Sequence, residues 1–306
     1  MKNLKQTSKI TNRKKAKTDS PLLLFFFYFL VLIFAIICVF PFLLMISSSF
    51  MVESEIIREG YKLWPKEFSL NSYKYLFTKS DQLINSYLVT IFITVVGTLF
   101  GLIFMSMAAF VLNRKNFKYR NSFSFFFYFT TLFSGGLVPT YMVYVNTLGL
   151  KDNILAMIFP GLMSAWSIFL LRNFMKSIPD SLYESASMDG ANDFVIYSKI
   201  YMPLSIPSLA TISLFLALGY WNEWYNAMLY IESNNKIPLQ LFLQRMINTA
   251  DISNLIAKGI VIDTSELPTQ SVKMATAVLA IGPIVLLYPF VQKYFVQGLT
   301  VGSVKG

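Results

Sequence analysis

Six stretches of the chain are nearly free of charged residues over a length that can cross the hydrocarbon core of a membrane, which takes about 20 residues as a helix. Unpaired backbone groups are not tolerated in lipid, and none of the six stretches alternates apolar and polar residues as the strands of a membrane barrel do. We therefore predict an all-α, polytopic membrane protein with six transmembrane helices. The predicted spans cover residues 21–46, 83–112, 121–145, 154–171, 205–228 and 274–291.

Two longer polar segments separate predicted spans on one side of the membrane, at residues 47–82 and 229–273. The first has mixed charge and turn-forming residues, so we predict a short ordered loop at the membrane interface. The second contains residues 238–246, whose apolar positions are compatible with a small amphipathic helix. Neither segment is long enough to form an independent domain.

The basic residues predict which side of the membrane each segment faces. Most of the 26 Lys and Arg residues share one side if the N-terminus is cytoplasmic, and the bias is sharpest in the short segments, where the positive-inside rule has most force. Residues 1–20 then form a basic cytoplasmic segment, and both termini are predicted to be cytoplasmic. We predict that the first span is retained rather than removed as a signal peptide, because its apolar run is too long and no Ala-x-Ala site follows it.

The composition narrows the chemistry that the chain can carry out. The 306 residues are 55% hydrophobic and 14% charged, against roughly 25% charged residues in soluble domains. With no histidine and a single cysteine, Cys38, the sequence excludes the usual zinc sites, histidine-dependent acid–base catalysis and an internal disulfide. The net charge of +10 would suit nucleic acid, but the basic residues gather beside the apolar spans. Membrane topology explains them better, and we expect no nucleic acid partner.

The segment between the fourth and fifth predicted spans, residues 177–203, carries the most information. Pro179 and Asp180 favour the start of a helix, and Ser181 with Glu184 three residues later fits a capping box. Gly190 then permits a bend that a residue with a side chain would resist. An ordinary interfacial loop with helical content would explain the composition of this segment equally well.

A longer pattern in the same segment resembles the EAA motif of ABC import permeases. That motif runs Glu-Ala-Ala, two residues, Asp-Gly, nine residues and Ile-x-Leu-Pro. Ser185 stands here in place of one alanine and Met202 in place of leucine, and both are mild changes. The matching positions in this chain are Glu184, Ala186, Asp189, Gly190, Ala191, Ile200 and Pro203.

The resemblance implies a defined assembly. In that family the motif forms a cytoplasmic coupling helix that docks into a groove on an ATPase subunit, and residues 21–306 would be the importer transmembrane domain. The sequence has no Gly-x-x-x-x-Gly-Lys-Ser/Thr loop, so we expect this chain to be a transport subunit rather than an enzyme, with ATP and Mg bound by partner subunits and no cofactor of its own. The implied partners in the bacterial plasma membrane are a second homologous permease, two ATPase subunits, an extracellular solute-binding protein and membrane lipid.

Further stretches resemble the carbohydrate-uptake group of these permeases, and the C-terminal one resembles a subgroup for oligosaccharides and larger glycans. They cover residues 85–86, 108–114, 135–141, 221–226 and 293–306. We therefore expect a sugar, an oligosaccharide or a related glycan as the substrate.

Two of these stretches are candidates for the substrate pathway. Aromatic faces stack on sugar C–H faces and amides form hydrogen bonds with hydroxyl groups. The second of these stretches, residues 221–226, therefore suits a glycan, although Trp and Tyr also favour a membrane interface. Gly135 and Gly136, with Pro139 after them, would break the third span, which suits either a water-lined cavity or close helix packing. The residues of the second stretch are Trp221, Asn222, Glu223, Trp224, Tyr225 and Asn226.

An ion-coupled secondary transporter is the main alternative function. Such carriers usually need ionisable residues at membrane depth, and the six spans contain only Glu223, close to an outer end. Topology alone leaves a channel or an assembly scaffold open, whereas the lack of a nucleophile–base pair or metal cluster disfavours an intramembrane enzyme.

Overall fold

The computed structural model describes residues 21–78, 80–249 and 270–285. These residues are helical apart from loops and one isolated bridge between Met51 and Phe68, which agrees with the predicted all-α class. The helices are α1 (Pro21–Ser49), α2 (Glu53–Glu59), α3 (Asn71–Thr78), α4 (Ser80–Asn113), α5 (Arg120–Leu132), α6 (Leu137–Met142), α7 (Leu155–Ile158), α8 (Ala165–Met175), α9 (Asp180–Met188), α10 (Asp193–Ile196), α11 (Met202–Leu204), α12 (Ile206–Trp221), α13 (Tyr225–Tyr230), α14 (Leu239–Thr249) and a last helix, Gln270–Val285.

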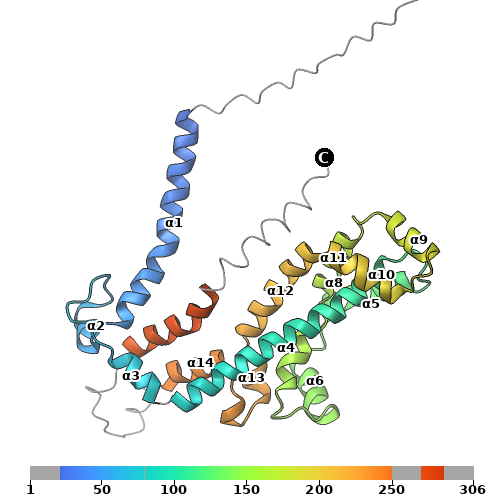
Figure 1. The fold of residues 1–306 in the computed structure, drawn as a ribbon. Helices are drawn as coiled ribbons and strands as arrows, with labels where there is room; N and C mark the ends of the chain where they lie inside the picture. Colours follow the sequence, from blue (N-terminus) through green and yellow to red (C-terminus); the bar gives the residue numbers. More distant parts are fainter. Residues whose placement is uncertain (1–20, 79, 250–269, 286–306) are drawn as a thin grey trace, which may run out of the picture.

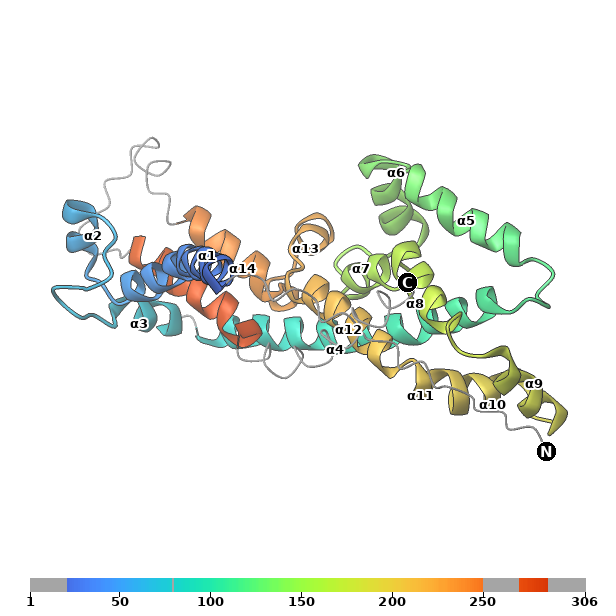
Figure 2. The same cartoon turned by 90° about the horizontal axis from the view of Figure 1, so that it is seen from above.

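Helix α4 runs the length of the bundle (Figures 1 and 2). Helices α9, α10 and α11 lie near one end of it, which we call the α9 end, and α2 and α3 lie near the other, which we call the α2 end. The predicted amphipathic helix at 238–246 is present as α14, near the α2 end.

Helix α1 is apolar around its whole circumference and stands apart from the other helices (Figure 1). Its 29 residues include no charged side chain, and within this chain only Ser48 and Ser49 are buried. A helix that is apolar on every side needs lipid or protein around it. Helix α1 therefore has the properties of a membrane span, as predicted for residues 21–46, and it continues to Ser49.

Three of the other predicted spans are not single straight helices. The third is interrupted between α5 and α6, where Gly136 has a φ of +85°, as its Gly-Gly pair predicts. The fourth is bent by 46° between the segments Leu155–Gly161 and Ala165–Met175. By length and composition, two of the described helices can cross a membrane alone, and the number rises to four if each bent pair counts as one span.

The predicted fifth span, residues 205–228, is wrong at its C-terminal end. Helix α12 stops at Trp221, and residues 222–224 separate it from the short helix α13. Helix α12 also meets the segment Asp193–Leu204 at an angle of 82°. The sixth span begins at Gln270, earlier than the predicted 274, and its predicted end lies outside the described residues, as do residues 1–20 and the C-terminal stretch 293–306.

Helix α4 packs against α12 and α8, and small residues let these helices come close. A Cβ atom on Gly97 would lie 2.4 Å from the ring of Tyr220, and one on Gly161 would lie 2.5 Å from its hydroxyl oxygen. The Tyr220 hydroxyl donates a hydrogen bond to the backbone carbonyl of Ile158 at 2.7 Å. A buried tyrosine is therefore held between two glycines, with its polar group satisfied.

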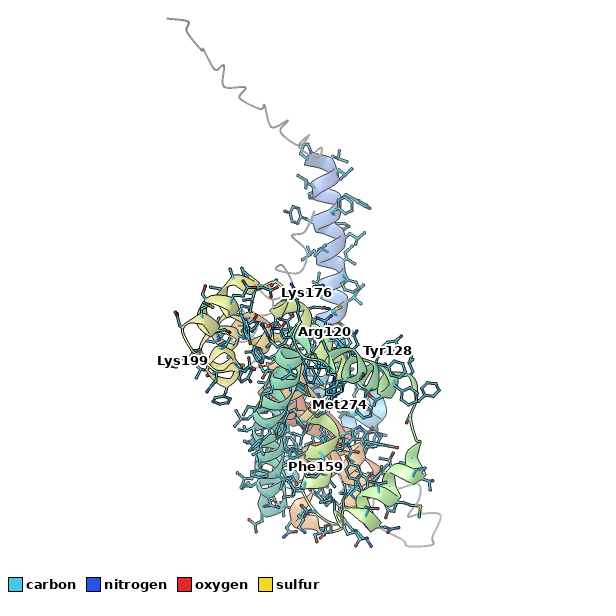
Figure 3. All side chains as sticks on the ribbon, turned by 90° about the vertical axis from the view of Figure 1, so that its right-hand side faces the viewer. Arg120, Tyr128, Phe159, Lys176, Lys199 and Met274 are labelled. Carbon is cyan, nitrogen blue, oxygen red and sulfur yellow. The ribbon has the colours of Figure 1, made fainter. Side chains whose placement is uncertain are left out.

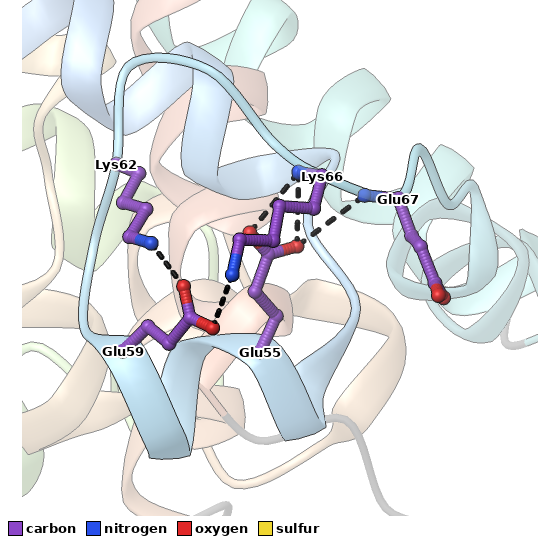
Figure 4. Close-up of polar contacts among 5 residues, drawn as sticks. All are labelled: Glu55, Glu59, Lys62, Lys66 and Glu67. Atoms are coloured by element: carbon purple, nitrogen blue, oxygen red, sulfur yellow. Dashed lines mark hydrogen bonds and ion pairs between the residues drawn. The ribbon is translucent and has the colours of Figure 1, made fainter.

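The loop after α1 is ordered by carboxylates, in agreement with the prediction of an ordered loop. The Glu55 carboxylate accepts the backbone N–H of Lys66 at 3.0 Å, and Glu59 pairs with Lys62 and Lys66 (Figure 4). Hydrogen bonds from Lys62 and Lys66 lower the pKa of Glu59 to about 2. Glu53 contacts the start of the last helix, so this loop also fixes the position of the chain at the α2 end.

Candidate functional site

Helix α9 forms most of the exposed part of the predicted coupling segment. It begins at Asp180, with Pro179 at the N-cap and no side-chain cap. The predicted capping box of Ser181 and Glu184 is therefore wrong, because Ser181 already lies inside the first turn. Asp180 occupies the start of the helix, where a negative charge is favourable.

The C-terminus of α9 is closed by Gly190. Its φ of +82° is in the left-handed region, which residues with a Cβ rarely adopt. The backbone N–H of Gly190 donates to the Ser187 carbonyl at 3.1 Å, and that of Ala191 reaches back to the Ala186 carbonyl at 3.0 Å. These bonds satisfy carbonyls that a helix end leaves free and turn the chain sharply. The bend predicted at Gly190 is present.

Two basic residues at the end of α4 attach α9 to the bundle. The Arg114 guanidinium lies 3.1 Å from the centre of the Tyr183 ring, and its Nη1 donates to the Tyr201 hydroxyl at 3.1 Å. The Lys115 ammonium donates to the Asp180 carboxylate at 2.6 Å and holds the pKa of that carboxyl below its usual value. The cation–π contact and the ion pair link the two helices at two points.

A second set of contacts continues from α9 toward α12. The Tyr183 hydroxyl donates to the Asp193 carboxylate at 2.8 Å, and the Asn192 side chain caps α10 through the Val195 N–H. The hydroxyl of Tyr197 lies 2.7 Å from that of Ser106 on α4. A displacement of α9 would therefore reach both α4 and, through the 82° bend, α12.

The outer face of α9 and the turn after it are open. Leu182, Met188 and Phe194 expose 41%, 88% and 67% of their surface, although all three are apolar. Such a group on a solvent-facing helix is typical of an interaction surface. Of the motif residues, Glu184, Asp189, Gly190 and Pro203 are exposed, while Ala186, Ala191 and Ile200 are half-buried against the bundle.

The residues predicted to line a substrate pathway fall into two groups. Trp221 is buried, and its indole N–H donates to the Ala280 carbonyl of the last helix at 3.2 Å. Glu223 accepts the backbone N–H and the side-chain amide of Asn226, both at 2.8 Å, and so caps α13. The exposed members are Asn222, Trp224 and Tyr225.

The other two pathway candidates lie at the interruption of the third span. Gly135 and Gly136 are exposed between α5 and α6, and Gly136 accepts a hydrogen bond from the Thr140 hydroxyl at 2.7 Å through its carbonyl. Among the described residues, no hydrogen bond or ring contact joins these two glycines to the Trp221 group.

Sequence reasoning missed the residues that hold α9 in place. The sequence pattern predicts no role beyond topology or resemblance for four residues: Arg114, Lys115, Tyr183 and Tyr201. Two basic residues directly after an apolar span are already explained by the positive-inside rule, so the sequence gives no reason to expect that they also pair with side chains of α9. Their partners lie 65 to 87 positions further along the chain, and only the fold brings them together.

Comparisons with known proteins identify the family. No family model matches the chain. It is 42% identical over 282 residues to the polygalacturonan/rhamnogalacturonan transport system permease protein YtcP of Bacillus subtilis (strain 168), which covers 90% of this chain and 96% of the relative. It is 39% identical over 270 residues to protein LplC of the same organism, covering 88% of this chain and 90% of the relative.

A solved structure leads to the same family. A chain from a bacterial ABC transporter involved in the import of the acidic polysaccharide alginate matches with a TM-score of 0.79 and 32% identity, over 92% of this chain and 99% of the other. Nothing in these relatives supports an ion-coupled transporter. The chain therefore belongs to the permease subunits of sugar ABC transporters, and it is a multi-pass transport subunit of the plasma membrane that works with ATPase subunits.

Proposed function

We propose that this chain forms part of the translocation path of an importer for oligosaccharides derived from acidic polysaccharides, driven by ATP and Mg on two ATPase subunits. A second homologous permease completes the path, and an extracellular solute-binding protein delivers the glycan. Two relatives support the substrate class, since one is named for polygalacturonan and rhamnogalacturonan and the other for alginate.

The observation that carries the proposal is the position of helix α9. One side of this helix is attached to α4, and its other side is exposed to solvent. Its free face combines the apolar Leu182 and Met188 with the acidic Glu184 and Asp189. An apolar centre with charged groups at its edge suits docking into a groove with basic residues at its rim. We assign this face to the ATPase subunit, with Ala186 and Ala191 allowing close packing underneath.

We place the α9 end on the cytoplasmic side. The Pro21 end of α1 points toward the upper side of Figure 1, where α9 also lies, and the basic residues Arg114, Lys115, Arg172 and Lys176 lie near α9. The positive-inside rule then supports cytoplasmic termini.

At the α2 end, we propose that the exposed Asn222, Trp224 and Tyr225 face the glycan, while Trp221, Glu223 and Asn226 support them. The rings of Trp224 and Tyr225 meet edge to face at 5.9 Å, which leaves ring surface for stacking on sugar C–H groups. Gly135 and Gly136 would let the third span open toward the same aqueous path.

The coupling role is tested in the complete importer, reconstituted in vesicles with its partner permease, ATPase subunits and binding protein. Glu184→Lys combined with Asp189→Lys is expected to abolish uptake of labelled oligogalacturonides and the stimulation of ATP hydrolysis by binding protein, with membrane insertion intact. Lys118→Glu combined with Lys74→Glu is the matched control, because it also reverses two exposed charges and both lie outside residues 177–203. Normal uptake and hydrolysis in the first variant would disprove the assignment.

Gly190 gives a second test of the same helix. Gly190→Pro removes the N–H that bonds to Ser187 and cannot adopt a φ of +82°, so we expect loss of transport. Gly190→Ala keeps that N–H at a strain of about 1–2 kcal/mol and should retain part of the activity. Equal transport by both variants would show that the shape of this turn is unimportant.

A further inference from the structure

A cavity of about 450 Å³ lies at the α9 end, between the end of α4, the start of α5 and the end of α8. Four basic side chains line it: Lys115, Arg120, Arg172 and Lys176. Figure 3 shows Arg120 and Lys176 close to each other on the same side of the bundle. Neither the family resemblance nor the coupling role assigns a function to this cavity.

The positive charge of the cavity is poorly balanced by the residues that line it. The one carboxylate among them is that of Asp180, which is already paired with Lys115 at 2.6 Å. Arg172 donates to the Ser124 hydroxyl at 3.3 Å, a neutral partner. Arg120, Arg172 and Lys176 therefore share one space whose one lining carboxylate is already paired with Lys115, and a bound anion would reduce their mutual repulsion.

A second cavity, of about 290 Å³, adjoins the same helix ends and is lined by apolar side chains alone, among them Leu112, Phe117, Phe123 and Phe127. Leu112 is followed by Asn113 of the basic cavity, and Phe123 lies one turn after Arg120 on α5. An anion with a long apolar chain would fill both spaces, whereas free phosphate would leave the apolar one empty.

We propose that these two cavities bind an anionic phospholipid, with its phosphate among Arg120, Arg172 and Lys176 and an acyl chain against Phe123 and Phe127. Basic pockets between membrane helices are suited to such headgroups. The lipid phosphate would also lie beside Pro179 and Asp180, which begin α9. The inner-leaflet location of this site rests on the proposed orientation, whereas the binding itself does not.

The test uses the complete importer purified in detergent, with bound lipid measured by native mass spectrometry. Wild-type importer is expected to retain phosphatidylglycerol in preference to phosphatidylcholine. Arg120→Gln with Lys176→Gln should lower the affinity for phosphatidylglycerol about 30-fold, since each of the two basic residues contributes about 1 kcal/mol near a lipid headgroup. The matched control is Lys118→Gln with Lys199→Gln, which removes two exposed charges outside the cavity and should retain the wild-type amount.

Three results would overturn the proposal. Equal retention of both lipids by the wild type shows that no site selective for an anionic lipid exists. This measurement uses the wild-type importer alone, so it does not depend on the folding of a variant. Displacement of the lipid by millimolar inorganic phosphate shows a free-anion site. Unchanged lipid with loss of the ATPase subunit in the Arg120/Lys176 variant shows a protein contact. Glycan uptake by the same importer preparations is measured in parallel. A failure of the coupling proposal appears in the uptake data, whereas a failure of the lipid proposal appears in the mass spectra.

Discussion

Among single residues, Tyr220 shows how closely α4, α12 and the bend of the fourth span fit together. Gly97→Ala would place a Cβ 2.4 Å from its ring, and the ring cannot move without losing its bond to Ile158. Overpacking of this kind costs about 1–3 kcal/mol, so we expect a lower melting temperature in detergent. Gly219→Ala on α12, the helix that carries Tyr220, is the control, because a Cβ there meets nothing within 4 Å. Equal melting temperatures for the two variants would contradict this account.

Arg114 is the residue whose loss should affect coupling most directly. Arg114→Lys keeps the positive charge but loses the planar contact with Tyr183 and the directed bond to Tyr201. We expect an intact importer that hydrolyses more ATP for each glycan imported, measured as the ratio of the two rates in vesicles. Lys118→Ala removes a nearby cation that lies 5.7 Å from the centre of the Tyr119 ring, and it should keep the wild-type ratio. An unchanged ratio in Arg114→Lys would mean that the contacts of Arg114 with Tyr183 and Tyr201 do not carry the coupling.

For whole elements, apolar runs predicted where the spans lie, but the only break predicted was the one at Gly135 and Gly136 in the third span. A run without charge must enter lipid whatever its shape, so α1, α4 and the bent pairs were found. The end of α12 at Trp221 depends in part on the indole bond to Ala280, a tertiary contact that the local sequence does not show, whereas the cap of the next helix by Glu223 is local. Gly190 was predictable because its conformation is local, whereas the capping box at Ser181 failed by two residues, since the N-cap is Pro179.

The last helix depends on a cap from a distant segment. The Glu53 carboxylate accepts the N–H groups of Gln270 and Ser271 at 2.8 and 2.9 Å, and the Ser271 hydroxyl at 2.9 Å. A carboxylate at a helix N-terminus accepts hydrogen bonds from backbone N–H groups that have no partner within the helix, and its negative charge interacts favourably with the helix dipole. Glu53→Ala should cost about 0.5–2 kcal/mol and speed amide exchange at 270 and 271, with a smaller effect for Glu53→Gln. Unaltered exchange at these two amides would show that the cap is dispensable.

Across the whole molecule, Asp152 joins the loop after the third span to the loop after α13. Its carboxylate accepts the Ser233 hydroxyl at 2.6 Å and its N–H at 2.9 Å, and pairs with Lys236 at 2.9 Å. Asp152 itself has a φ of +53°, a conformation that Asn tolerates and Ala does not. Asp152→Asn therefore tests the charge with little change in backbone strain, and we expect it to lower the melting temperature at pH 7.

The dependence of this loss of stability on pH follows from the direction of the pKa shift of Asp152. The hydrogen bonds from Ser233 and Lys236 lower the pKa of Asp152 from its ordinary value of 3.8. Its contribution to stability is thus complete above that value and is lost as the pH falls below it. The difference in melting temperature between wild type and Asp152→Asn should stay constant from pH 8 to 5 and shrink below about pH 4. A difference that already vanished between pH 8 and 5 would mean that this carboxylate is not held ionised by the two loops, and that they meet through other contacts.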